Sequence, residues 1–154
     1  MHYVNTKTIL SPKNGMNLYR GCTHGCIYCD SRSDVYNMGH DFEDIEVKQN
    51  ALELLKKELL KRPKAMIGTG AMTDPYIPLE KHLQYVRKSL ELIYRYGFGF
   101  TCITKSDLIL RDLDLLKKIG FVEILFDFCK NFLIILFFYI FALILLKTFE
   151  KFVI

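Results

Sequence analysis

The chain of 154 residues alternates between segments with helical and with strand-like spacing of apolar side chains. In residues 47–62, apolar side chains recur every three or four positions with Lys and Glu between them, which predicts an amphipathic helix. The same spacing returns at residues 83–93, ahead of Gly97, and at residues 110–119, ahead of Gly120. Because glycine is favoured directly after a helix, these positions predict where the second and third helices end.

Short apolar runs between these helices predict strands at residues 16–20, 65–70 and 98–104, and residues 121–126 have the composition of a fourth. Residues 1–15 contain a group of turn formers and are interpreted as a lead-in segment. Strands that alternate with helices form parallel sheets with right-handed crossovers. The expected fold class is therefore α/β, a partial (βα) barrel of three to four units.

The composition changes after residue 120. Residues 132–146 are fifteen consecutive apolar residues, and with Asn131 the uncharged run of sixteen lies between Lys130 and Lys147. As a helix this run is about 24 Å long, against a hydrocarbon core of about 30 Å. Two interpretations stay open, a transmembrane helix with lysines at both ends and a buried core helix. We divide the chain into residues 1–120 and an apolar tail, 121–154.

Charge and cysteine content narrow the class of protein. A formal net charge of +4, with lysines dispersed among acids, gives no argument for nucleic-acid binding. The five cysteines are an odd number, and the first residues lack the basic and apolar pattern of a secretion signal. We expect a reducing, cytoplasmic location, with membrane association through residues 132–146 as the alternative, and cysteines used for metal binding or catalysis.

Three of the cysteines, Cys22, Cys26 and Cys29, lie within eight residues at spacing C-x3-C-x2-C, in a glycine-containing loop after the first predicted strand. Thiolates select zinc, copper(I) and iron–sulfur clusters. Structural zinc usually has four protein ligands, so zinc would need His24 or His40 as its fourth. A cubane cluster held by three cysteines instead leaves one iron open to a substrate or cofactor. The ligand count favours the cluster.

The motif C-x3-C-x-aromatic-C, with Tyr28 before the last cysteine, resembles the signature of the radical SAM enzymes. The wider run of residues 17–30 is similar to the subgroup related to spore photoproduct lyase. Further stretches agree with that subgroup and extend the resemblance over residues 7–119. These stretches are Gly68-Thr69-Gly70, Thr73-Asp74-Pro75-Tyr76 with Pro78 and Glu80, Thr104-Lys105-Ser106 and Arg111-Asp112.

The resemblance implies a set of cofactors and their ligands. Cys22, Cys26 and Cys29 would hold a 4Fe-4S cluster whose open iron binds S-adenosyl-L-methionine (SAM). An external one-electron reductant would then allow cleavage of SAM to a 5'-deoxyadenosyl radical, which takes a hydrogen atom from the substrate. The subgroup implies a lyase-like reaction, and DNA enters as a partner by family analogy only.

Further residues receive roles by the same resemblance. Tyr28 would lie by the adenine of SAM, and Gly68, Thr69 and Gly70 would help to hold its methionine amino group. Lys105 and Arg111 follow the third predicted strand and are candidates for a carboxylate of the cofactor or an anionic substrate, with a solvated helix position as the alternative for Arg111. Asp74, Tyr76 and Glu80 lie on the expected active face, although Asp-Pro is also a common turn.

The chain departs from the family in length. Radical SAM cores usually have six βα units, and three or four are expected here, so we expect a truncated or frame-shifted chain. Two alternatives are that a partner chain completes the barrel, or that the tail anchors an iron–sulfur protein to a membrane. Two functions therefore compete, a radical SAM enzyme and a catalytically incomplete iron–sulfur protein.

Overall fold

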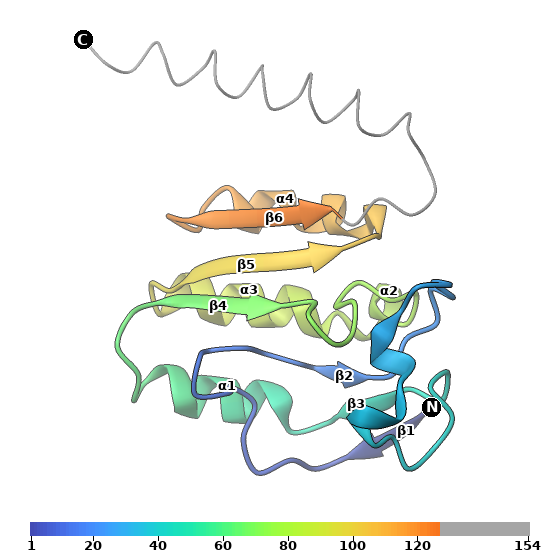
Figure 1. The fold of residues 1–154 in the computed structure, drawn as a ribbon. Coiled ribbons are helices and arrows are strands. Elements are labelled where there is room, and N and C mark those ends of the chain that lie inside the picture. The colour runs from blue at the N-terminus through green and yellow to red at the C-terminus, as the bar shows by residue number, and fades with distance from the viewer. Residues whose placement is uncertain (127–154) are drawn as a thin grey trace, which may run out of the picture.

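The larger of two three-stranded sheets, the one with the longer strands, is parallel (Figure 1). The computed structural model describes residues 1–126. Within them, strands β4 (Met66–Thr69), β5 (Gly99–Thr104) and β6 (Val122–Phe126) pair in that order and in parallel. The α/β class and a parallel sheet are confirmed, and residues 121–126 do supply a strand. The first predicted strand, residues 16–20, is instead a strand over Tyr19–Arg20 only and pairs in a second sheet.

The smaller sheet is formed by segments that precede β4 in the chain. Strand β3 (Glu46–Lys48) lies between β1 (His2–Val4), with which it is parallel, and β2 (Tyr19–Arg20), with which it is antiparallel. His2 is the register partner of Glu46 in this sheet. The sequence predicted neither β1 nor β3.

The chain just before β2 extends the larger sheet. The predicted turn at residues 11–15 is present, because the Ser11 amide donates to the Gly15 carbonyl at 2.8 Å. After this turn the Met16 amide donates to the Gly68 carbonyl at 2.7 Å, and Gly15 forms a parallel bridge with Gly68. The segment that leads into the cysteine loop therefore runs alongside β4 and delivers that loop to the carboxyl end of the sheet.

Helices cover one face of the larger sheet, where α3 and α4 lie behind the strands in Figure 1. Most of the apolar side chains that predicted α1 and α3 are fully buried, including Leu55, Leu59, Leu90 and Ile93. Because these side chains pack into a single core with β4 and β5, the amphipathic spacing and the fold agree. The helices are α1 (Ala51–Leu59), α2 (Glu80–Leu83), α3 (Tyr85–Arg95) and α4 (Leu113–Leu116), and a 3-10 helix (Asp107–Asp112) precedes α4.

The helix boundaries differ from the predicted ones. The helix expected over 47–62 begins at Ala51, because Val47 is buried as a central residue of β3. Gln84 takes the left-handed conformation, with φ of 54°, and separates α2 from α3 within the segment expected as one helix. The helix expected over 110–119 is a 3-10 helix followed by a single α-turn.

The apolar C-terminal helix predicted from residues 132–146, within the tail 121–154, lies outside the described residues. Across residues 1–126, none of the helices combines the length and apolar character that a membrane crossing requires.

Candidate cofactor site at the strand ends

A pocket of about 160 Å³ lies where the cysteine loop meets the carboxyl ends of β4 and β5. Ligands of open parallel sheets bind in this position, beyond the carboxyl ends of the strands. The pocket is lined by residues of three segments, the cysteine loop, the loop after β4 and the end of β5. They are Cys22, His24, Cys26, Tyr28, Cys29, Asp30, Ser31, Gly70, Ala71, Met72, Asp74, Ile103, Thr104 and Lys105.

All three predicted cysteine ligands line this pocket, but they differ in how they are held. Cys22 is buried, and its amide donates to the Phe42 carbonyl at 3.0 Å. Gly21 makes this approach possible, since a Cβ there would lie 2.4 Å from the Phe42 oxygen and its φ is 87°. Cys26 and Cys29 are half-buried on the far part of the loop. Burial raises the pKa of the Cys22 thiol, so ligation there requires that a proton be displaced.

The three thiols in one pocket match the ligand count of an iron–sulfur cubane with one open iron. Structural zinc usually takes a fourth protein ligand. Within residues 1–126, one set of three potential ligand atoms lies within 4.8 Å of one another, and it belongs to His2, His40 and Glu46 rather than to the cysteines.

Asp74 joins the cysteine loop to the ends of β4 and β5. Its carboxylate accepts hydrogen bonds from the hydroxyl of Thr104 at 2.7 Å and from the amides of Lys105 and Tyr76, both at 2.8 Å. His24 Nε2 lies 3.3 Å from the second carboxylate oxygen, an ion-pair distance without hydrogen-bond geometry. Burial opposes ionisation, but the contact with His24 and the hydrogen bonds outweigh it and lower the pKa of Asp74.

Tyr28 and Lys105, which the sequence assigned to cofactor binding, lie against each other at the pocket rim. Lys105 Nζ contacts the Tyr28 hydroxyl and lies 4.4 Å from the centre of its ring. The ring is half exposed, so one aromatic face and one cation border the same opening. The structure thus brings together two residues that are 77 positions apart in the chain.

The predicted glycine stretch divides into two parts. Gly70 lines the pocket with a φ of 98°, and a Cβ there would lie 2.1 Å from the Ile103 carbonyl oxygen. Gly68 and Thr69 lie earlier, inside β4, where the backbone of Gly68 bonds to Asn14 and Met16. Neither of these two residues lines the pocket. Their assignment to SAM binding remains a prediction.

Arg111 and Glu80 belong to a buried network beside the pocket rather than to its lining. Arg111 donates to Glu80 Oε1 at 3.0 Å and to both oxygens of Asp112, at 2.9 and 2.8 Å. Both carboxylates are fully buried, and Glu80 also bonds to the Tyr19 hydroxyl while Asp112 bonds to that of Tyr76. Arg111 is therefore neither an anion ligand of the pocket nor a solvated helix residue.

The sequence analysis missed Met72 and Ile103 as pocket residues, did not pair His24 with Asp74, and named Thr104 only within a stretch that carries the resemblance, without a role. Two signals were available for Thr104: side chains of a strand alternate between its two faces, and Thr104 is the last residue of β5. His24 gave no signal, because its contact depends on how the loop folds over the sheet. Cys102 is fully buried in β5, as expected of a core thiol, and Cys129 lies outside the described residues.

Comparison with known proteins agrees with this geometry. Residues 16–128 match the family model of the Radical SAM superfamily. The match covers more than two thirds of the chain and includes the cysteine loop, β4, β5 and β6. The chain belongs to the radical SAM superfamily, and its parallel sheet is consistent with part of that fold.

The curated relatives are longer than this chain. An uncharacterized protein of Methanocaldococcus jannaschii is 35% identical over 123 residues, which are 79% of this chain and 46% of the relative. Uncharacterized proteins of Mycobacterium bovis and Mycobacterium tuberculosis are 33% identical over 111 residues, 67% of this chain and 32% of each relative. This chain thus spans less than half the length of these relatives. No solved structure matches it.

Proposed function

We propose that the protein binds a 4Fe-4S cluster through Cys22, Cys26 and Cys29 and binds SAM in the same pocket, as an enzyme that initiates radical chemistry. The observation that carries the proposal is the convergence of the three thiols on one pocket at the ends of β4 and β5. Membership of the radical SAM superfamily supports it, because that family generally uses this cluster and SAM.

The bound cluster and SAM, with an electron from an external reductant, would supply cleavage of the carbon–sulfur bond of SAM to methionine and a 5'-deoxyadenosyl radical. The protein supplies binding, orientation and exclusion of water. Tyr28 offers an exposed aromatic face for the adenine, and Lys105 offers a cation for the carboxylate. Asp74 fixes the loop segments that carry Lys105 and Tyr76 through three hydrogen bonds.

The substrate class is a finer proposal. The motifs quoted above resemble those of spore photoproduct lyase, which suggests a lyase-like repair reaction on DNA. That suggestion depends on the resemblance alone, because these relatives are uncharacterized proteins. The reaction on SAM can be tested without knowing the substrate.

Anaerobic reconstitution with iron and sulfide tests the proposal on the full chain. We expect absorption and, after reduction, electron paramagnetic resonance signals of a 4Fe-4S cluster that change when SAM is added. With dithionite as the reductant we expect 5'-deoxyadenosine, measured by mass spectrometry. A cluster that forms and responds to SAM but yields no deoxyadenosine would favour the catalytically incomplete iron–sulfur protein instead.

Replacement of single cysteines tests the ligand assignment. Cys26→Ala should abolish the cluster, because one of only three thiolate ligands is lost. Cys102→Ala is the matched control, since this thiol is buried in β5 and does not line the pocket. Equal iron content in the Cys26→Ala variant and the unchanged protein would show that the assignment is wrong.

A further inference from the structure

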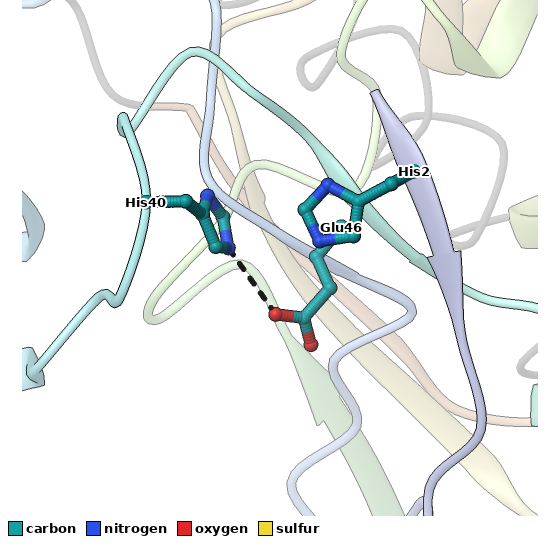
Figure 2. Close-up of side chains that lie close together, drawn as sticks. All are labelled: His2, His40 and Glu46. Carbon is teal, nitrogen blue, oxygen red and sulfur yellow. Dashed lines mark hydrogen bonds and ion pairs between the residues drawn. The ribbon is translucent and has the colours of Figure 1, made fainter.

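Two histidines and a glutamate converge on the smaller sheet, away from the cysteine pocket (Figure 2). His2 lies on β1, Glu46 is its register partner on β3, and His40 lies in the loop that leads to β3. One potential ligand atom from each of the three lies within 4.8 Å of the other two. None of the three lines the cysteine pocket, so the group is separate from the cofactor site.

Hydrogen bonds fix which nitrogen of each histidine is left for a ligand. His40 Nδ1 lies 3.0 Å from the Asp41 carbonyl oxygen, and a carbonyl can only accept, so Nδ1 carries the hydrogen. His2 Nδ1 lies 3.0 Å from Asp44 Oδ2. An ionised carboxylate also only accepts, which leaves Nε2 of each ring with a lone pair when the imidazole is neutral.

The lone pair of His40 Nε2 faces a negative group. His40 Nε2 lies 3.3 Å from Glu46 Oε2, and two acceptors at this distance repel each other unless a cation lies between them. Either a proton or a metal ion between His40 Nε2 and Glu46 Oε2 can remove this repulsion.

We propose that His2, His40 and Glu46 bind a zinc ion. Two imidazole nitrogens and one carboxylate form a common three-ligand set for zinc, with the fourth position open to water. Asp44 supplies the outer contact typical of such sites, a carboxylate that holds Nδ1–H of a ligating histidine. Ligand atoms on tetrahedral zinc lie roughly 3.3 Å apart for bonds of about 2.0–2.1 Å, so separations of up to 4.8 Å need to contract by at most 1.5 Å.

The location would let the ion link two parts of the chain. His40 belongs to the chain segment that starts with the cysteine loop, whereas His2 and Glu46 belong to the smaller sheet. Zinc bound by all three residues would fasten the C-terminal part of that segment to the sheet, close to the point where Phe42 bonds to Cys22. The proposal does not depend on the cluster, because it uses no residue of the pocket.

The test must prevent zinc from binding to the cysteine loop. In the full chain with Cys22→Ser, Cys26→Ser and Cys29→Ser, we expect one equivalent of Zn²⁺ to remain after desalting, measured by mass spectrometry of metals. Co²⁺ should give visible absorption bands of a tetrahedral ion without a thiolate charge-transfer band. No retained zinc in this variant would overturn the proposal, whatever the outcome of cluster reconstitution.

Further substitutions in the same variant without the three loop cysteines locate the ligands. His40→Gln and Glu46→Gln should each weaken zinc binding at least tenfold, and Asp44→Asn should weaken it about 10–100-fold through loss of the outer contact. His82→Gln on α2 is the matched control, because His82 is exposed and distant in sequence from the group. Circular dichroism establishes that each variant is folded. Unchanged affinity in folded His40→Gln or Glu46→Gln protein would refute the assignment.

Discussion

The close approach of Gly70 to β5 makes a sharp prediction for the variant Gly70→Ala. A Cβ at this position would lie 2.1 Å from the Ile103 carbonyl oxygen and 2.8 Å from two further backbone atoms of that residue. To reach a contact of 3.4 Å, the two backbones must separate by 1.3 Å, the difference between 3.4 and 2.1 Å. Backbone cannot rotate away as a flexible side chain can, so the end of β4 must move away from the end of β5.

The cost has two parts. Alanine at a φ of 98° carries backbone strain, about 1–3 kcal/mol. Separation of the strands leaves one buried backbone group without its partner, about 1–3 kcal/mol more. We therefore expect a loss of about 2–6 kcal/mol from a total stability of about 5–15 kcal/mol, measured as the free energy of unfolding in urea. Because Thr104 and Lys105 follow Ile103 into the pocket, the iron content after reconstitution should fall as well.

Gly97→Ala is the matched control for this prediction. Gly97 also has a positive φ, 67°, but a Cβ there meets no atom within 4 Å. The control therefore keeps the conformational cost, about 1–2 kcal/mol, and omits the collision with backbone. Equal losses of stability in the two variants would contradict the described contact between Gly70 and Ile103. Unchanged iron content in a destabilised Gly70→Ala protein would show that the pocket does not depend on this contact.

Three further predictions concern charged groups. Arg111→Met should lower the free energy of unfolding by about 3–5 kcal/mol, because the buried carboxylates of Glu80 and Asp112 lose their partner. Arg95→Met, which changes an exposed arginine, should alter it by no more than about 0.5 kcal/mol. Similar denaturant midpoints for the two variants would refute the network of Arg111, Glu80 and Asp112. The pKa of Asp74 is lowered in the folded state, so its stabilising contribution is present above its ordinary pKa of about 3.9 and is lost as the pH falls through the lowered value. Asp74→Asn should therefore flatten the dependence of the free energy of unfolding on pH in this acid range. An unchanged slope of that free energy against pH would contradict a stabilising role of the Asp74 carboxylate. Lys105→Met should weaken SAM binding about 10–100-fold, measured through the cluster's paramagnetic signal, whereas Lys118→Met, which changes an exposed lysine, should not.

The sequence predicted the larger sheet well, because its strands are short apolar runs separated by amphipathic helices. It failed at Val47, whose spacing to Ala51 and Leu55 is helical although Val47 is the buried centre of β3. The partners of that strand lie more than 25 residues away in the chain, at Tyr3 and Tyr19. Periodicity depends on local geometry, so such distant pairing of strands of two or three residues leaves no clear pattern in the sequence.

The candidate site was predictable to a similar degree and for a similar reason. Cysteine spacing identified Cys22, Cys26 and Cys29, and the sequence placed their loop directly after the first predicted strand. The function of Arg111 was not predictable, because only the folded chain shows that it lies between the buried carboxylates of Glu80 and Asp112. A positive charge after a strand gives the same sequence signal in a ligand site and in a buried network.

The bond between the Cys22 amide and the Phe42 carbonyl has a consequence for the order of assembly. It closes a loop of twenty residues, at an entropic cost of about 2.7 kcal/mol for (3/2)RT ln n plus a constant, and the folding of the sheet must meet that cost. The folded sheet therefore holds the backbone of the first ligand, Cys22, whereas Cys26 and Cys29 are half-buried further along the loop. In this respect the loop differs from a zinc finger, which is unfolded until its metal binds. Cluster insertion into this protein is expected to follow folding of the sheet rather than to start it.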